Sequence, residues 1–103
     1  MAVKLESAEV ARRVGEDAPG WAIEGNGRAL RKTFEFHDFV HAMHFVNRLA
    51  ESADEAEHHP DLDIRYNIVT VALSTHDAGG ITEKDFALAE EAERAASVVR
   101  GIA

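Results

Sequence analysis

Histidines and carboxylates that could exchange and hold protons gather in the second half of this 103-residue chain. His58 and His59 stand directly before Pro60, and His76 and Asp85 follow. Histidine is the side chain that gains and loses a proton near neutral pH, with an unperturbed pKa of about 6.5. A carboxylate beside a histidine can hold the ring in one orientation. These residue types in one segment therefore indicate a site for acid–base chemistry.

His58 and His59 fall at the predicted end of a long helix, where more than one interpretation is open. A histidine near a helix C-terminus can be a favourable cap, because the helix dipole there favours positive charge. Pro60, however, restricts the backbone of His59 and gives it a defined direction. Asp54 lies four residues before His58, so we expect these two side chains to be in contact on one helix face. A zinc site is the other alternative, although neighbouring rings rarely converge on one ion.

His76 and Asp85 also occupy positions that suit a site. His76 follows the last predicted strand and opens a loop that contains Gly79 and Gly80, and such loops often carry functional residues. Alternatively it is an exposed loop histidine. Asp85 is the third residue after Thr82, which resembles a helix capping box. A carboxylate held in that way is well fixed, so it could also orient a histidine ring.

Other residues of chemical interest have plainer alternatives. His37, His41 and His44 have helical spacing that could place them on one face as metal ligands, but we interpret them as part of a solvated face. Trp21 is either a core residue or a flat wall for a planar heterocycle. Tyr66 is either a packing residue or a hydroxyl at a site or interface.

The pattern of apolar residues predicts the elements that must position these side chains. In chain order these are helix 8–16, strand 21–24, strand 28–36, helix 38–57, strand 62–66, strand 68–75 and a helix that begins at 82. Ser7 and Asp38 are the expected helix caps, and Asn67 is expected in the left-handed position of the second hairpin turn. The apolar face predicted for the long helix consists of Phe39, Ala42, Met43, Val46, Leu49, Ala50 and Ala53.

The order α-β-β-α-β-β-α predicts an α+β fold in which three helices cover one face of a four-stranded antiparallel sheet. Residues 1–103 are expected to form a single domain with one core. The open face and the sheet edges would need a partner, so we expect a homo-oligomer, either a homodimer or a homotetramer.

Composition excludes several classes of function. The net charge of −8 argues against direct binding of nucleic acid or of an anionic membrane. The chain has no cysteine, which leaves no disulfide, thiolate ligand or thiol nucleophile. No apolar run approaches the roughly 20 residues of a membrane span, and the N-terminus has no signal-peptide core. We therefore expect a soluble cytoplasmic protein.

The spacing of the candidate residues resembles that of the pterin-4a-carbinolamine dehydratase family. The family pattern is an acidic residue, His-His-Pro, an aromatic residue, a histidine and an aspartate, and the chain matches it in order from Asp54 to Asp85. Further similarity lies in Gly20-Trp21, in the hairpin from Gly25 to Leu30, in Ser74-Thr75-His76, and in the segment from Gly80 to Phe86. The resemblance covers nearly the whole chain.

This resemblance implies the same fold and a hydro-lyase activity. The implied reaction is dehydration of 4a-hydroxytetrahydropterin to quinonoid dihydropterin, which recycles the pterin cofactor of aromatic amino-acid hydroxylases. It requires no metal and no organic cofactor. By resemblance, the catalytic residues are His58, His59 and His76, with Asp85 supporting His76. The implied substrate-binding residues are His59, Trp21, Asp54, Ser74 and Thr75.

Two alternatives share the same residues. Animal members of the family also act as dimerisation cofactors of a homeodomain transcription factor, so a binding or regulatory protein is one alternative. The other is a dehydratase whose substrate is a different pterin, such as one related to molybdopterin. A panel of pterins with different side chains would separate the latter from the main hypothesis.

Overall fold

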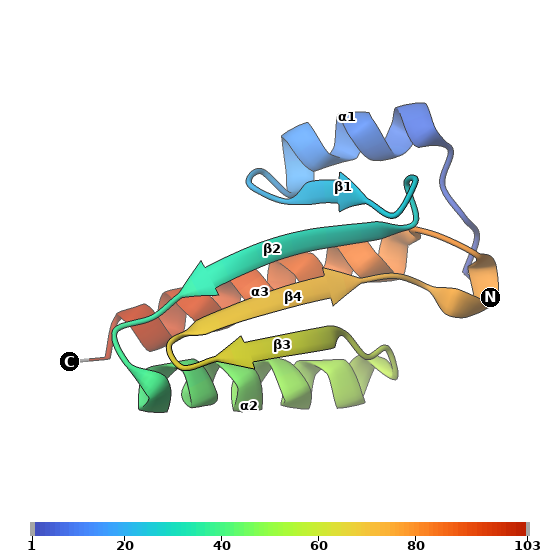
Figure 1. Ribbon diagram of the computed structural model, residues 1–103. Helices are drawn as coiled ribbons and strands as arrows, with labels where there is room; N and C mark the ends of the chain where they lie inside the picture. The colour runs from blue at the N-terminus through green and yellow to red at the C-terminus, as the bar shows by residue number, and fades with distance from the viewer. Residues whose placement is uncertain (1, 103) are drawn as a thin grey trace.

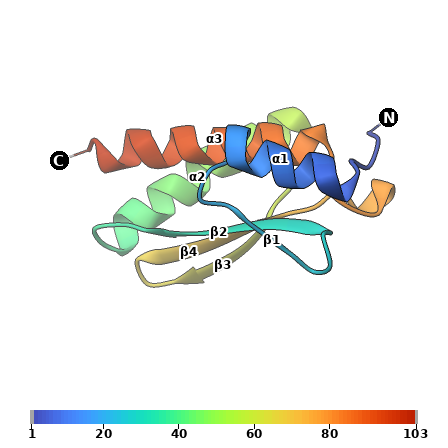
Figure 2. The same ribbon diagram turned by 90° about the horizontal axis from the view of Figure 1, so that it is seen from above.

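The computed structural model describes residues 2–102. Its elements, in order, are α1 (Ser7–Asp17), β1 (Ala22–Glu24), β2 (Ala29–Glu35), α2 (Phe39–Ala56), β3 (Asp61–Arg65), β4 (Ile68–Leu73), the short 3-10 helix η1 (His76–Ala78) and α3 (Glu83–Arg100). The strands form one antiparallel sheet in the order β1-β2-β4-β3. All three α-helices lie on one face of the sheet (Figures 1 and 2), which confirms the predicted α+β fold.

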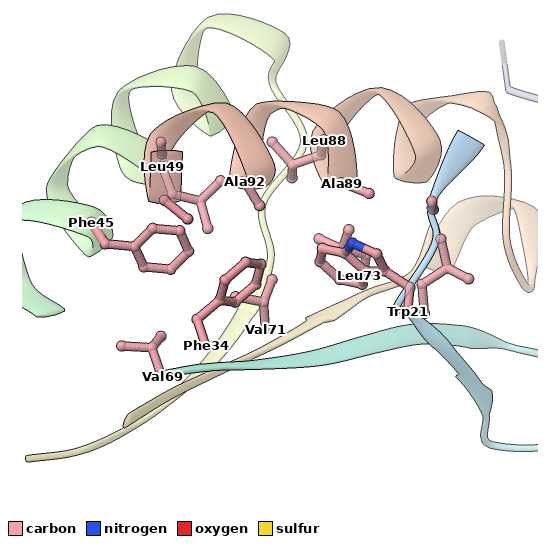
Figure 3. Packing of buried hydrophobic residues seen from close by; sticks show 14 of the residues in the cluster. Trp21, Phe34, Phe45, Leu49, Val69, Val71, Leu73, Leu88, Ala89 and Ala92 are labelled. Atoms are coloured by element: carbon pink, nitrogen blue, oxygen red, sulfur yellow. The ribbon is translucent and has the colours of Figure 1, made fainter. Parts of the chain in front are cut away.

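The core lies between the sheet and the two long helices. Alternate residues of the central strands point toward the helices because side chains alternate across a strand. Phe34 of β2 packs against Phe45 of α2, with ring centroids 4.9 Å apart. Figure 3 shows this layer, which α3 completes with small and branched residues. Its fully or almost fully buried members include Leu30, Phe34, Phe45, Leu49, Val69, Val71, Leu73, Leu88, Ala89 and Ala92.

Both ends of helix α2 have a defined conformation, and its C-terminal end sets the direction of the His58-His59 pair. Asp38 caps its start, as predicted, by accepting a hydrogen bond from the His41 backbone N–H at 2.8 Å. At the other end Glu57 takes the left-handed conformation with φ 52°, and the His58 N–H donates to the Ala53 carbonyl at 3.1 Å. A left-handed residue reverses the chain direction after a helix. His58 is thereby turned back toward the protein interior.

The first helix and the second hairpin each differ from prediction in one detail. Ser7 is the first residue of α1 and not its cap, because Glu6 holds the cap position without a side-chain hydrogen bond. In the second hairpin it is Tyr66, with φ 53°, that takes the left-handed position predicted for Asn67. The Asn67 side chain instead donates to the Phe36 carbonyl at 2.8 Å and so ties this turn to the end of β2.

The buried face of α2 also differs from the predicted one. Phe45, which the predicted stripe omitted, is fully buried, whereas Phe39 is 47% exposed. The buried residues Ala42, Phe45, Leu49 and Ala53 follow spacings of three and four, which is the period of a helix face. The aromatic cluster of Phe34 and Phe36 on the sheet selects this face, since Phe45 contacts both rings.

Within residues 2–102, no helix combines the length and the apolar character that crossing a membrane would require.

Truncation of a core side chain tests this packing. We expect Leu49→Ala to lower the free energy of unfolding by about 2–5 kcal/mol, because a fully buried side chain is replaced by a cavity. Val40→Ala, in the same helix but at a position that is 58% exposed, should change it by less than about 0.5 kcal/mol. Urea unfolding measures both. Equal losses in the two variants would contradict the assigned buried face.

The Asp38 cap predicts a pH dependence. The pKa of the Asp38 carboxyl lies below its ordinary value of 3.8, because the carboxylate accepts hydrogen bonds from the backbone and the ring of His41. A lowered pKa in the folded state adds stability above the unfolded-state pKa, and this stability disappears as the pH falls through the folded-state value. The stability advantage of wild type over Asp38→Asn should therefore shrink below about pH 3.8. Urea unfolding of both proteins from pH 7 to pH 3 measures this, and an advantage that grew with acid would contradict it.

Candidate active site

Three segments meet at one end of the sheet and form a pocket of about 250 Å³. They are the end of α2, the segment from the end of β4 into η1, and the start of α3, which lie at the same end of the molecule in Figure 1. The residues that line the pocket are Glu57, His58, His59, Ser74, Thr75, His76, Asp77 and Lys84. The three histidines singled out in the sequence are therefore brought together.

Asp85 is the buried centre of this site. Its carboxylate has no exposed surface, yet each oxygen has a donor. Oδ1 accepts from His58 Nε2 at 2.6 Å, while Oδ2 accepts from the Thr75 hydroxyl at 2.8 Å and from the Thr82 backbone N–H at 2.9 Å. The Thr75 and Thr82 hydroxyl oxygens are themselves 2.8 Å apart. Among the described residues, no buried side-chain nitrogen or oxygen is left without a partner.

These contacts define the proton arrangement on His58. An ionised carboxylate can only accept hydrogen bonds, so the Nε2 of His58 must carry the proton that it donates. In neutral imidazole the other nitrogen then has a free lone pair. Nδ1 of His58 is therefore the nitrogen that can take a proton from a bound molecule. The His58 side chain is only 10% exposed, which restricts its motion and its contact with water.

His59 is held differently, by the carboxylate that was predicted to hold His58. Asp54 Oδ1 lies 2.8 Å from His59 Nε2, so the predicted Asp54–His58 contact is wrong. The reason is the left-handed Glu57, which turns His58 inward to Asp85 and leaves His59 on the side of Asp54. This second pair is exposed, with 65% of the His59 side chain and 81% of the Asp54 side chain accessible.

His76 shares the pocket but lacks the predicted support from Asp85. Both Asp85 oxygens are used by His58, Thr75 and Thr82, so the prediction that Asp85 supports His76 is wrong. His76 is exposed at the first position of η1. The capping box predicted for Thr82 and Asp85 is present, and it is this cap that brings the carboxylate beneath His58.

Trp21 and Tyr66 lie away from the pocket. Trp21 is 4% exposed, packs edge-on against Phe34 at 5.9 Å, and donates from its indole N–H to Glu93 at 2.9 Å. It is thus a core residue and does not line the pocket, contrary to the wall position that the family resemblance implied. Tyr66 is 68% exposed at the tip of the β3–β4 hairpin, at the opposite end of the sheet in Figure 1.

Three charged residues of the pocket wall were not predicted from the sequence, namely Glu57, Asp77 and Lys84. Lys84 could have been found, because it lies between Thr82 and Asp85 in the capping box, and its backbone N–H donates to the Thr82 hydroxyl at 3.2 Å. Glu57 and Asp77 each directly adjoin a candidate histidine in sequence. Their position at a turn, next to a candidate histidine, was the signal from which they could have been predicted.

The histidines of α2 do not join the pocket. The rings of His37 and His41 are 5.7 Å apart, those of His41 and His44 are 6.3 Å apart, and His41 Nδ1 is 2.6 Å from Asp38 Oδ1. Within residues 2–102, no group of three or more His, Cys, Asp or Glu side chains is placed to hold a metal ion.

Larger hollows exist but lack the chemistry of the histidine pocket. One of about 390 Å³ lies between α2 and α3, and another of about 640 Å³ lies beside α1. Neither is lined by histidine. We place the candidate active site at the smaller pocket because, among the hollows described, only this one is lined by histidines.

The fold and site define an α+β protein with histidines and a buried carboxylate at one end of an antiparallel sheet. Residues 3–95 match the family model described as pterin 4 alpha carbinolamine dehydratase. The chain belongs to this family, which confirms the resemblance seen in the sequence. The family supports assignment as a pterin carbinolamine dehydratase, a lyase.

The sequences of relatives align with almost the whole of this chain. A relative from Thermomicrobium roseum is 51% identical over 94 residues, which cover 91% of this chain and 98% of that protein. A relative from Sulfolobus acidocaldarius is 48% identical over 89 residues, which cover 86% of this chain and 94% of that protein. Both carry the name "Putative pterin-4-alpha-carbinolamine dehydratase".

Solved structures share the fold. The crystal structure of a transcriptional coactivator/pterin dehydratase from Brucella melitensis is similar with a TM-score of 0.85 and 31% identity, covering 90% of this chain and 98% of that one. A pterin dehydratase-like RuBisCO assembly factor of the alpha-carboxysome has a TM-score of 0.61 and 22% identity. The match covers 85% of this chain and 98% of that one. The second likeness concerns the fold alone.

The Thr75 hydroxyl offers a test of the buried network. Thr75→Val removes one donor to Asp85 with little change in shape, and we expect it to lower the free energy of unfolding by about 1–3 kcal/mol. Thr75→Ser keeps the hydroxyl and should retain most of the stability. Nitrogen-15 NMR of the imidazole nitrogens should show Nε2-protonated His58 in wild type and in Thr75→Ser. An Nδ1-protonated neutral His58 in wild type would contradict the proton arrangement derived above.

Proposed function

We propose that this protein dehydrates a 4a-hydroxytetrahydropterin to quinonoid dihydropterin and water by histidine acid–base catalysis. Family membership supports the reaction class. The observation that supports the histidine mechanism is the buried hydrogen bond from His58 to Asp85, beneath a pocket that two further histidines line. It supplies a fixed ring with a free lone pair next to other groups that can donate a proton.

The reaction needs one proton removed and one proton delivered. The proton on N5 of the pterin leaves, its electron pair forms the C4a–N5 double bond, and the C4a–O bond breaks. The hydroxyl departs as water after it receives a proton. Base and acid must therefore act at N5 and at the hydroxyl on the adjacent C4a, a task that two proton-carrying side chains in one small pocket can share.

His58 is assigned as the base and His76 as the acid. Asp85 accepts the Nε2 proton of His58, so Nδ1 is available to take the N5 proton. The carboxylate then stabilises the positive charge that His58 gains, as a buried acid does for a catalytic histidine elsewhere. His76 lines the same pocket from η1, where it can protonate the departing hydroxyl.

The remaining site residues bind or position. His59, oriented by Asp54, and Ser74 lie where they can hydrogen-bond the pterin ring. The Thr75 hydroxyl is engaged with Asp85 and Thr82, so we assign it a positioning role in place of the direct substrate contact that the resemblance implied. Trp21 supports the core beneath the sheet and contacts no substrate in this proposal.

In the cell, this activity would recycle the pterin cofactor of an aromatic amino-acid hydroxylase. Such hydroxylases generate the 4a-hydroxy compound, so one of them would be the source of the substrate. We propose a cytoplasmic homodimer or homotetramer for this role, since the open face of the sheet is left uncovered by the three helices (Figure 2).

Rates of dehydration test the proposal directly. We expect wild type to accelerate dehydration of enzymatically generated 4a-hydroxytetrahydropterin, and His58→Ala and His76→Ala each to lose roughly 10²–10⁴-fold of that acceleration. Stopped-flow absorbance measures the rates. His44→Ala, on the outer face of α2, is the matched control and should keep full activity.

Each outcome has a separate meaning. Full activity in His76→Ala would remove its assigned role as the acid. No acceleration by wild type over the spontaneous rate would overturn the proposed function and favour a binding or regulatory protein. Treatment of wild type with a chelator should leave the rate unchanged.

A further inference from the structure

The loop from Thr75 to Thr82, which carries His76, is closed at its base. The Thr75 N–H donates to the Gly80 carbonyl at 2.9 Å, and the Gly80 N–H donates to the Thr75 carbonyl at 3.3 Å. The Thr75 and Thr82 hydroxyl oxygens lie 2.8 Å apart, and the Thr75 hydroxyl also donates to Asp85 at 2.8 Å. The base of the loop is therefore held from the protein interior.

The N-terminal segment holds the same loop from the outside. The Leu5 N–H donates to the Ile81 carbonyl at 2.9 Å. Within residues 2–102, no other hydrogen bond joins residues 76–81 to a segment outside the loop. The side chain of Lys4 crosses the buried Gly80 so closely that a Cβ at that position would lie 3.0 Å from Lys4 Cε. Figures 1 and 2 both show the N-terminal segment beside η1.

These contacts reach His76 through the backbone. The Gly79 N–H donates to the His76 carbonyl at 3.0 Å, and Gly79 directly precedes Gly80, which Lys4 covers. The His76 side chain is exposed, and its ring makes no hydrogen bond with another side chain in the part of the chain that the structure describes. The place of this ring is thus set by the loop backbone, whereas the buried bond to Asp85 sets that of His58.

We propose that the N-terminal segment at Lys4 and Leu5 is a positioning element for His76. It holds the loop so that His76 keeps its place in the pocket wall, independently of the buried network that orients His58. This inference rests on the proposed dehydratase function, in which His76 supplies a proton. Small displacements matter there, because an error of about 1 Å in the position of a catalytic group can cost about 10²-fold in rate.

A proline at position 5 tests the contact, because proline lacks the N–H that Leu5 donates to Ile81. We expect Leu5→Pro to lower kcat for dehydration of 4a-hydroxytetrahydropterin by about tenfold to hundredfold. KM should change by less than about twofold, because His76 is assigned to proton transfer and not to binding. Stopped-flow absorbance measures both constants.

Two further variants isolate the lost hydrogen bond. Val3→Pro is the matched control, since Val3 is 76% exposed and its N–H has no backbone acceptor within residues 2–102. It should keep the kcat of wild type. Leu5→Ala shortens the side chain but keeps the N–H, so it should keep more of kcat than Leu5→Pro. An equal loss in Val3→Pro and Leu5→Pro would contradict a role of the Leu5–Ile81 bond.

The His76→Ala background separates positioning from a general loss of structure. If Leu5 acts through His76, Leu5→Pro should change the residual rate of His76→Ala by less than about twofold, because the effects of coupled residues do not add. A role in folding alone would lower the rate by the same factor in both backgrounds. That result would overturn the proposal.

NMR provides a readout that does not depend on turnover. In Leu5→Pro the imidazole signals of His76 should shift, while those of His58 should stay in place because Asp85 still holds that ring. Unchanged His76 signals would overturn the proposal. If thermal unfolding shows that Leu5→Pro does not fold, amide hydrogen exchange in wild type replaces it. The Leu5 N–H should then exchange more slowly than the Val3 N–H, and equal rates would overturn the proposal.

The proposed function and the positioning role fail in different ways. If wild type does not accelerate dehydration of 4a-hydroxytetrahydropterin, the dehydratase function itself is wrong. If wild type accelerates it and Leu5→Pro has the same kcat, the function stands and the positioning role is overturned.

Discussion

The carboxylate of Asp85 is the constraint on which the rest of the site depends. A carboxylate without any exposed surface is costly unless every oxygen finds a donor, and here those donors come from three separate segments. Thr82 supplies a backbone N–H at the start of α3, Thr75 supplies a hydroxyl after β4, and His58 supplies its ring N–H after α2. Satisfying one charge therefore joins two helix ends and a strand end, and it orients His58 at the same time.

The same arrangement explains why two adjacent histidines can differ in behaviour. His58 is nearly buried against a fully buried acid, while His59 is exposed and paired with an exposed acid. A left-handed residue at Glu57 separates their directions, since it ends α2 just before them. Neighbouring residues of identical type thus receive different environments, which is how a small fold can assign different tasks to chemically equal side chains.

Much of the fold could be predicted because its signals are local. Asp38 and Thr82 cap helices where their types predict, and the order of helices and strands follows from hydrophobic period and turn residues. The predictions were wrong where contacts between residues far apart in the sequence determine the local structure. Phe45 is buried because the aromatic cluster of Phe34 and Phe36 lies opposite it. Tyr66 takes the left-handed turn position while the Asn67 side chain binds the Phe36 carbonyl, a partner 31 residues away in sequence.

The sequence by itself determined which three histidines line the pocket and which family the chain resembles, because residue types and their spacing can be read from it directly. It did not determine which carboxylate holds which histidine. The spacing of Asp54 and His58 indicated a contact within the helix, and the resemblance implied that Asp85 supports His76. The structure pairs Asp54 with His59 and Asp85 with His58. Only the tertiary structure decided this pairing. It depends on the chain direction at the end of α2 and on where the packing of α3 against α2 places the buried Asp85 carboxylate. No local sequence pattern determines the position of that carboxylate relative to His58.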